Sequence, residues 1–227
     1  LGDVVVIAPD SPQSAMGHAI TINDTLKLTK VHLDKEIEQE YSCSGTPVDC
    51  VKIAVNEILK RKPDLCVSGI NHGSNSSINV IYSGTMSAAV EAGIEGIPAI
   101  GFLLLDYSWD ANFEPIKSHI KKITLEVLKH GLPEGVILNV NFPKLAKEEI
   151  KGTKICRQAK AMWQEEFDKR TNPLGKEYYW LTGKFVNLDK GTDTDEWALE
   201  NGYISIVPVQ FDLTAHHAIQ QLNSWEL

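Results

Sequence analysis

Residues 64–77 read Asp-Leu-Cys-Val-Ser-Gly-Ile-Asn-His-Gly-Ser-Asn-Ser-Ser, and residues 82–89 read Tyr-Ser-Gly-Thr-Met-Ser-Ala-Ala. Leu65 to Val67 is a short apolar run with a β-branched member, which predicts a buried strand that stops at Ser68-Gly69. A loop made almost entirely of Gly, Asn and Ser follows, and Ser83-Gly84-Thr85 then opens a helix. The stretch therefore predicts a polar loop between the carboxyl end of a strand and the N-terminus of a helix.

A loop of this kind is suited to bind phosphate, because the free N–H groups and the dipole of a helix N-terminus attract anions. In open α/β sheets, ligands bind at the carboxyl edge of the strands. The neutral oxygens of Asn and Ser suit Mg²⁺ or Mn²⁺ better than zinc. The Gly-Lys-Ser/Thr of a P-loop is absent, and so is the Gly-x-Ser-x-Gly of a serine hydrolase elbow, which argues against both of those enzyme classes.

The rest of the first 150 residues alternates between strand and helix patterns. Val4 to Ala8 is a continuous apolar run, which is typical of a central parallel strand. Alternating apolar residues across 19–31, with Asn23-Asp24 as a turn signal, predict an antiparallel hairpin. Further strands are predicted at 41–43, 98–105 and 136–140, and helices at 47–61, 85–95 and 116–130. We therefore expect an α/β fold with a mostly parallel sheet over residues 1–150.

Residues 151–227 differ in style from the core. Aromatic residues and Lys are frequent, glycines punctuate the segment, and strands are predicted at about 178–186 and 203–208. Thr214 to Leu222 predicts a terminal helix with an N-cap near Asp212 or Thr214. We expect a β-rich C-terminal appendage that ends in a helix.

Net charge and composition limit the kinds of binding partner and the cellular location that we expect. The formal net charge of −8 disfavours nucleic-acid polymers and anionic membranes. No apolar run approaches the roughly 20 residues that span a bilayer. The four cysteines show no Cys-x-x-Cys pair and no zinc-site spacing with His, so we expect free core thiols and a cytoplasmic location, with a Cys43–Cys50 disulfide as the alternative.

The start of the sequence leads directly into an apolar strand. Leu1-Gly2-Asp3 precedes Val4 to Ala8 at once, and central parallel strands are usually fed by a crossover helix. Gly2 fits the residue that ends such a helix. We therefore expect a strand and a helix upstream of Leu1, while a native start at an edge strand is the alternative.

Ser14 and Asn71 are the candidate metal ligands, because each follows a predicted parallel strand and both loops lie at the carboxyl edge. Neutral oxygens alone bind a divalent ion weakly, so at least one carboxylate is also expected, either Asp10 or an acidic residue upstream. A simpler interpretation exists for each residue. Asn71 can be a turn residue, and Ser83 and Thr85 can be helix caps.

Several motifs, in order along the chain, resemble the SurE family of stationary-phase survival nucleotidases. They are Ala8-Pro9-Asp10 with Ser14, Gly17-His18-Ala19-Ile20-Thr21, Gly45-Thr46-Pro47-Val48-Asp49-Cys50-Val51, Val67-Ser68-Gly69-Ile70-Asn71-His72-Gly73-Ser74-Asn75, Tyr82-Ser83-Gly84-Thr85, Asn139-Val140-Asn141-Phe142-Pro143, Arg157-Gln158 and Gly202-Tyr203-Ile204-Ser205-Ile206. The resemblance covers essentially the whole chain.

The resemblance implies a Rossmann-like three-layer sandwich, with residues 1–150 as the catalytic core. It also implies a metal-dependent 5′-nucleotidase that removes phosphate from nucleoside 5′- and 3′-monophosphates. It implies one divalent ion per subunit, Mg²⁺ or Mn²⁺, held by two adjacent aspartates of an Asn-Asp-Asp-Gly motif and by the residues that match Ser14 and Asn71. That motif is absent from this sequence, and in the family it precedes the first residues here by about one strand and one helix. Either the sequence omits it or the chain is inactive, and we favour omission.

The resemblance also implies how substrate and subunits are held. Asn75, Ser83, Gly84 and Thr85 are expected to bind the phosphate oxygens. A homodimer or homotetramer is expected in which C-terminal segments are exchanged, with residues 151–227 as the oligomerisation extension. In that arrangement Asp212 and His216 reach a neighbouring subunit's site, where His216 acts as a general acid.

Two other functions are compatible with the same residues. A non-catalytic nucleotide-binding or scaffold protein would keep the fold and lack the acidic pair. A hydrolase of short-chain polyphosphate or sugar phosphates would use the same scaffold on a different substrate. Knowing the residues upstream of Leu1 would distinguish the non-catalytic protein from an enzyme. A panel of substrates would distinguish the second hydrolase from a nucleotidase.

Overall fold

The computed structural model describes residues 1–225. Strand β5 (Ala99–Leu104) is an interior strand of its main sheet. All six residues of β5 are buried. It pairs in parallel with β4 (Cys66–His72) on one side and with β6 (Val136–Phe142) on the other. A continuous apolar strand with parallel neighbours on both sides must be covered on both faces, which accounts for its composition.

Two strands from beyond residue 150 complete this sheet. Its order is β4-β5-β6-β10-β7, in which β10 (Ile204–Gln210) runs antiparallel to β6 and β7 (Thr153–Ile155) pairs in parallel with β10. The C-terminal part of the chain therefore contributes to the core sheet as well as to the appendage. The division into units at 1–150 and 151–227 stays a prediction.

A second, smaller sheet has the order β1-β3-β2. Strand β1 (Val5–Pro9) pairs in parallel with β3 (Gln39–Cys43), and β2 (Leu28–Val31) is antiparallel to β3. The hairpin predicted within 19–31 is wrong, because only its second half is a strand and that strand pairs with β3. The first half is held instead by side chains of the neighbouring helix, which are described below.

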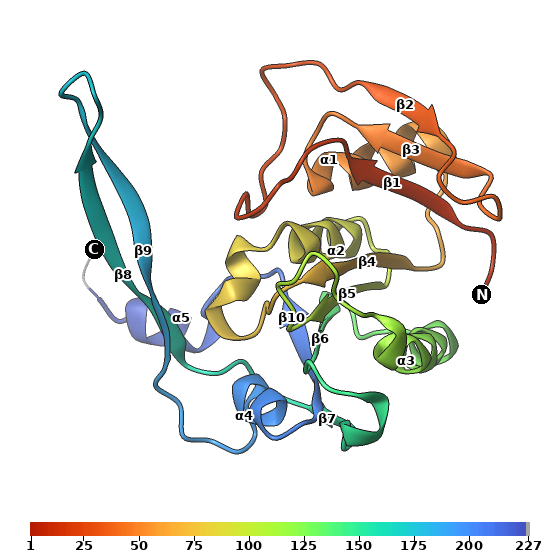
Figure 1. The fold of residues 1–227 in the computed structure, drawn as a ribbon. Helices are drawn as coiled ribbons and strands as arrows, with labels where there is room; N and C mark the ends of the chain where they lie inside the picture. The colour runs from red at the N-terminus through yellow and green to blue at the C-terminus, as the bar shows by residue number, and fades with distance from the viewer. Residues whose placement is uncertain (226–227) are drawn as a thin grey trace.

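Helices cover both faces of the main sheet, giving three layers (Figure 1). On one face lies α2 (Gly84–Ile94), together with α1 (Pro47–Ile53) and the π-helical turn that continues it (Ala54–Leu59); on the other lies α3 (Lys117–His130). Helix α1 begins at a capping box formed by Thr46 and Asp49. The expected α/β fold with a mostly parallel central sheet is confirmed.

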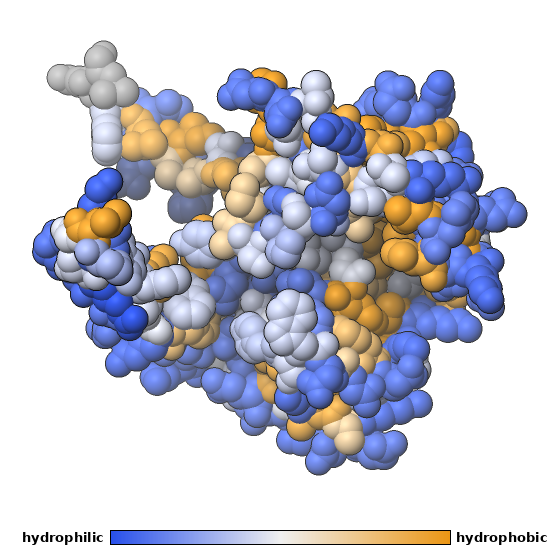
Figure 2. All heavy atoms as spheres, turned by 45° about the horizontal axis from the view of Figure 1, so that its top comes forward, coloured by the Kyte–Doolittle hydropathy of each residue, from blue (hydrophilic) through white to orange (hydrophobic). Residues whose placement is uncertain are grey.

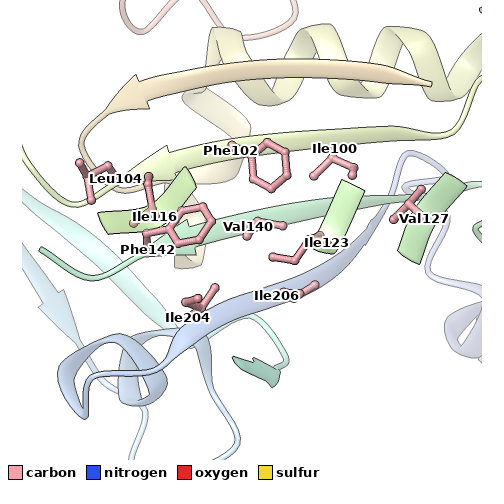
Figure 3. Packing of buried hydrophobic residues seen from close by; sticks show 10 residues of the cluster. All are labelled: Ile100, Phe102, Leu104, Ile116, Ile123, Val127, Val140, Phe142, Ile204 and Ile206. Carbon is pink, nitrogen blue, oxygen red and sulfur yellow. The ribbon is translucent and has the colours of Figure 1, made fainter. Parts of the chain in front are cut away.

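The core follows the alternation of the strands. Side chains of β5 at Ile100, Phe102 and Leu104 point to the α3 face, where they meet β6 and β10 (Figure 3). The residues between them face α2, and Leu103 packs with Met86 there. The cluster on the α3 face consists of Ile100, Phe102, Leu104, Ile116, Ile123, Val127, Val140, Phe142, Ile204 and Ile206.

A long two-stranded hairpin projects from the body of the molecule (Figures 1 and 2). It consists of β8 (Ala161–Thr171) and β9 (Glu177–Asn187), and only the second of these was predicted. Nearly all of β8 is exposed. Its sequence therefore lacks the alternation of apolar and polar residues by which a half-buried strand is predicted. Figure 2 shows open space between this arm and the body.

The remaining elements are short. Helix α4 (Asp195–Glu200) precedes β10, and 3₁₀ turns lie at Ser77–Tyr82, Glu114–Ile116 and Lys147–Glu149. The terminal helix α5 (His216–Leu222) is confirmed, but the predicted cap is wrong, because the residue before it is Ala215, which makes no side-chain cap. Asp212 instead accepts a hydrogen bond from the N–H of Thr214.

The structure also bears on the cysteines and on membrane-spanning segments. All four cysteines, at positions 43, 50, 66 and 156, are free thiols, so the Cys43–Cys50 disulfide is not formed. Within residues 1–225, none of the helices combines the length and the apolar character that crossing a membrane requires.

Replacing Phe102 tests how tightly the hydrophobic cluster on the α3 face is packed. Its side chain is fully buried and packs against Phe142, with ring centroids 6.0 Å apart. We expect Phe102→Ala to lower the free energy of unfolding by about 3–5 kcal/mol, because the cavity cannot collapse between a strand and a helix. Urea denaturation measures it, with Leu33→Ala at an exposed position as the control. A loss below about 1 kcal/mol would show that the site is loosely packed.

Candidate functional site

Asn71 lies at the carboxyl end of β4. The strand continues to His72, so the predicted end at Ser68-Gly69 is wrong, and Asn71 is a strand residue rather than a turn residue. Pairing with β5 shifts register between Ser68 and Asn71. The φ of Gly69 is +110°, and a Cβ there would lie 2.3 Å from the carbonyl oxygen of Phe102, so only glycine fits.

The side chain of Asn71 is exposed at that edge. Its amide nitrogen Nδ2 donates to the carbonyl of His72 at 3.0 Å. This bond fixes the carboxamide, and within residues 1–225 the side-chain oxygen Oδ1 has no hydrogen-bond donor. Asn71 thus presents an oriented, neutral oxygen at the carboxyl edge of the sheet.

The N-terminus of α2 begins with Ser83 as the N-cap. Its hydroxyl accepts from the N–H of Met86 at 3.0 Å, and the amide of Asn75 donates to the same hydroxyl. Ser83 is therefore a helix cap, and it is at the same time joined to the polar loop. Gly84 and Thr85 are the first two residues of the helix, where N–H groups have no acceptor inside the helix.

Two buried asparagines of β6 hold the polar loop in place. The backbone N–H of Asn75 donates to Oδ1 of Asn141 at 2.9 Å, and Nδ2 of Asn139 donates to the backbone carbonyl of Asn75 at 2.8 Å. Nδ2 of Asn141 donates to Oδ1 of Asn139 at 2.9 Å, which closes the set. We call these three residues the carboxamide ladder. From the sequence, Asn139 and Asn141 are part of a family motif, but no function is predicted for either residue.

The loop after β1 lies against the N-terminus of α2. The N–H of Gly17 donates to the carbonyl of Tyr82 at 3.3 Å. A Cβ on Gly84 would lie 3.4 Å from the carbonyl oxygen of Gln13 and 3.1 Å from Pro47, so Gly84 permits this close approach. Ser14, next to Gln13 and exposed, is thereby brought to the same end of the molecule as Gly84 and Thr85.

Buried carboxylates of the two neighbouring helices anchor this loop. Asp49 accepts from the backbone N–H of Thr21 and from its hydroxyl, the latter at 2.6 Å, and from the backbone N–H of Thr46 at 2.9 Å. Burial by itself raises the pKa of Asp49, but the hydrogen bonds from Thr21 and Thr46 outweigh it and hold the pKa below its usual value. Glu91 of α2 pairs with His18 at 2.9 Å and with Lys52.

A third carboxylate ties the far end of the polar loop to α4. Asp195 accepts from the backbone N–H of Ser77 at 2.7 Å and from that of Ala159 at 2.8 Å. Burial raises the pKa of Asp195, and these backbone hydrogen bonds oppose the rise. Ser77 and Asp195 are 118 residues apart in sequence. No local pattern in either segment could have indicated the contact.

Asp212 and His216 form a pair of their own. His216 Nε2 lies 2.7 Å from Oδ2 of Asp212, and both side chains are exposed. Hydrogen bonds from Thr214 and then from His216 lower the pKa of Asp212 to about 2. Among the described residues, no hydrogen bond or ion pair joins this pair to Asn71, Ser83 or their neighbours.

The predicted site residues thus fall into two groups. Asn75, Ser83, Gly84 and Thr85 are brought together, and the loop of Ser14 lies beside them, while among the described residues Asp212 and His216 form no hydrogen bond or ion pair with this group. No hydrogen bond joins Ser14 to Asn71 in residues 1–225. Over the same range, no three His, Cys, Asp or Glu side chains come together as a metal site.

The sequence and the fold were compared with those of known proteins. The model of the family described as survival protein SurE matches residues 1–165. The chain belongs to the SurE family. It is 77% identical over its whole length to the 5′-nucleotidase SurE of Flavobacterium psychrophilum, and 77% identical to that of Flavobacterium johnsoniae, covering 88% of each. The crystal structure of the SurE protein from Aquifex aeolicus matches 98% of this chain, and 88% of its own, with a TM-score of 0.83 at 40% identity.

Replacing Asp49 tests the anchor of the Ser14 loop. Because the folded-state pKa lies below the unfolded value of about 3.9, the ionised carboxylate stabilises the fold above that pH and loses this contribution as pH falls through the folded-state pKa. We expect Asp49→Asn to cost about 1–3 kcal/mol at pH 7 and progressively less below pH 4. Urea denaturation at several pH values measures it.

The exposed Asp24 provides the matched control for this experiment, since it accepts a backbone hydrogen bond at a turn but anchors no neighbouring helix. Asp24→Asn should change stability by less than about 0.5 kcal/mol at any pH. An equal loss at pH 7 and at pH 3 for the Asp49 variant would contradict an ionic anchor.

Proposed function

We propose that the chain is a 5′-nucleotidase that hydrolyses nucleoside 5′- and 3′-monophosphates to nucleoside and phosphate. What supports this is the grouping of four uncharged residues, Asn75, Ser83, Gly84 and Thr85, which we propose as a phosphate cradle, with the loop of Ser14 beside them. The 5′-nucleotidases at 77% identity, matched along the whole of this chain, support the reaction.

The phosphate is proposed to sit at the N-terminus of α2. The N–H groups of Gly84 and Thr85 would donate to its oxygens, and the helix dipole would favour its negative charge. The amide of Asn75 and the hydroxyl of Ser83 would complete the cradle, in orientations that the carboxamide ladder and the N-cap already fix. Preorganised donors of this kind stabilise the charge that builds up in the transition state.

A divalent cation, Mg²⁺ or Mn²⁺, fits the donors at this edge. Asn71 offers a fixed neutral oxygen and Ser14 an exposed hydroxyl, which are hard ligands of the type that these ions prefer. Every member of the phosphate cradle is also uncharged, so a cation is needed to balance the phosphate. The charged ligands are proposed to be the two adjacent aspartates of the family's Asn-Asp-Asp-Gly motif.

A divalent ion held by Asn71, Ser14 and the two aspartates would supply positive charge and lower the pKa of a bound water. The chain's own residues then have separate tasks. Asn71 and Ser14 position the ion, Asn75 and Ser83 orient the phosphate, and the anchors at Asp49 and Glu91 hold the Ser14 loop against α2.

The β8–β9 arm is proposed to join subunits. Its aromatic side chains remain exposed in the single chain, and a two-stranded hairpin cannot bury them by itself. They are Trp163, Phe167, Tyr178, Tyr179 and Trp180. A second copy of the chain, as a homodimer or homotetramer with exchanged C-terminal segments, would cover them and bring the Asp212–His216 pair to a neighbouring site. The free thiols support a reducing, cytoplasmic location.

The metal assignment predicts a loss of metal affinity in Asn71→Ala and Ser14→Ala. We expect each variant of the full-length protein to need at least about tenfold more Mn²⁺ for half-maximal phosphatase activity. Both positions are exposed, so the free energy of unfolding should stay within about 0.5 kcal/mol of wild type. Metal titration, by activity and by calorimetry, measures it.

Asn56 gives a matched control, because it is also exposed and its amide also donates to a backbone carbonyl, that of Lys52 at 2.8 Å. Asn56→Ala should leave the Mn²⁺ requirement unchanged. Wild-type activity of the Asn71 and Ser14 variants at limiting Mn²⁺ would refute the assignment of both ligands.

The general-acid assignment predicts that His216→Ala lowers kcat about 10²-fold or more while Mn²⁺ affinity stays unchanged. The reason is that a neighbouring subunit's His216 would protonate the leaving oxygen without touching the metal. Steady-state kinetics and metal titration check the two parts, and light scattering checks that the protein is an oligomer. A loss of Mn²⁺ affinity, or a stable monomer at micromolar concentration, would contradict the proposal.

A further inference from the structure

A short loop after β5 lies beside the candidate site. In the pairing of β4 with β5, Asn71 is opposite Leu103 and His72 is opposite Leu104. The N–H of Gly73 donates to the carbonyl of Leu104 at 2.8 Å, which extends the pairing by one residue. Residues 105–113 therefore leave the sheet at the same edge as the polar loop that follows Asn71.

Tyr107 of this loop rests on the polar loop itself. The backbone N–H of Ser74 donates to the Tyr107 hydroxyl at 3.3 Å. A Cβ on Gly73 would lie 2.5 Å from ring carbon Cε1 of Tyr107, so the ring packs directly on the glycine, whose φ is +87°. Gly73 is two residues, or about 7 Å of strand, beyond Asn71.

Asp106 anchors the loop that carries Tyr107. This buried carboxylate accepts from the backbone N–H of Ser108 at 3.0 Å, from the Ser108 hydroxyl at 2.6 Å, and from Lys144 at 3.0 Å. At the other end of the loop, Phe113 packs edge-on against His72, with ring centroids 5.3 Å apart. The position of Tyr107 is therefore fixed on both sides.

The Tyr107 side chain is nevertheless 77% exposed. An aromatic residue that merely reaches the surface is ordinary and needs no function. Tyr107 differs because a hydrogen bond, a glycine and an anchored loop hold its ring at the edge of a phosphate-binding loop while the ring stays open. A rigid, exposed ring of this kind is the element with which proteins stack a nucleobase.

The geometry points to Tyr107 as a specificity-determining residue that stacks the nucleobase of the substrate. This inference rests on the proposed nucleotidase function and names the part of the site that receives the base. Stacking uses the flat face that all bases share, so it selects nucleotides over phosphate esters that lack a base and discriminates little between bases. The gain expected from one stacked base is about tenfold in kcat/KM.

The test compares 5′-AMP with ribose 5-phosphate, which carries the same sugar and phosphate but no base. In the full-length protein, Tyr107→Ala should lower the ratio of kcat/KM for 5′-AMP to kcat/KM for ribose 5-phosphate about tenfold. Tyr107→Phe keeps the ring and should keep the ratio. Trp109→Ala removes a fully exposed ring from the same loop and should change the ratio less than twofold.

Three outcomes would overturn the inference. Equal losses on both substrates in Tyr107→Ala would mean that the ring only positions residues 73–74. A fall in the ratio for Trp109→Ala equal to that for Tyr107→Ala would assign the effect to the loop as a whole. Wild-type kcat/KM on both substrates in Tyr107→Ala would remove the stacking role and leave the nucleotidase function standing.

Calorimetric binding of the same two ligands separates this inference from the proposed function. Wild-type protein that hydrolyses neither ligand, yet binds 5′-AMP about tenfold more tightly than ribose 5-phosphate through Tyr107, would refute the nucleotidase and keep the stacking residue. Protein that neither hydrolyses nor binds 5′-AMP would overturn both.

Discussion

The carboxamide ladder of Asn75, Asn139 and Asn141 is the interaction on which the site depends. The polar loop has few apolar side chains to pack, so its backbone must be fixed by hydrogen bonds. The ladder supplies these from inside the sheet, where both β6 asparagines are buried and each is paired with a partner. A buried carboxamide without partners would cost about 1–3 kcal/mol, so the loop and the strand each need the other. The loop is thus tied to the sheet through β6.

Three other parts of the site are attached to this loop by separate anchors. Ser83 joins the loop to α2, Asp195 joins it to α4, and Tyr107 closes over its beginning. The Ser14 loop is held by its own pair of carboxylates, Asp49 and Glu91. These anchors come from segments far apart in sequence, and one of them, Asp195, lies on α4 beyond residue 150.

The sequence predicted the elements whose signals are local. The apolar run at β5, the cap at Ser83 and the small-residue loop before α2 each carry their own pattern, and they suffice to locate a site at the carboxyl edge. The contacts of Asn141 and Asp195 could not be predicted, since each joins residues more than 60 positions apart. One signal was present but unused: two asparagines in an otherwise apolar strand, spaced by two, share one buried face.

The boundary errors have a common physical cause. The sequence predicts that β4 ends at Ser68-Gly69, because glycine usually interrupts a strand. In the structure Gly69 allows the strand to pass close to the carbonyl of Phe102 and to continue. The hairpin across 19–31 failed because Thr21 bonds to Asp49 rather than to another strand. In both places the local propensity was outweighed by a tertiary contact, and in both places the contact serves the site. The backbone conformation at Gly69 sets the position of Asn71. The hydrogen bonds of Thr21 to Asp49, which replace strand pairing there, fix the loop of Ser14.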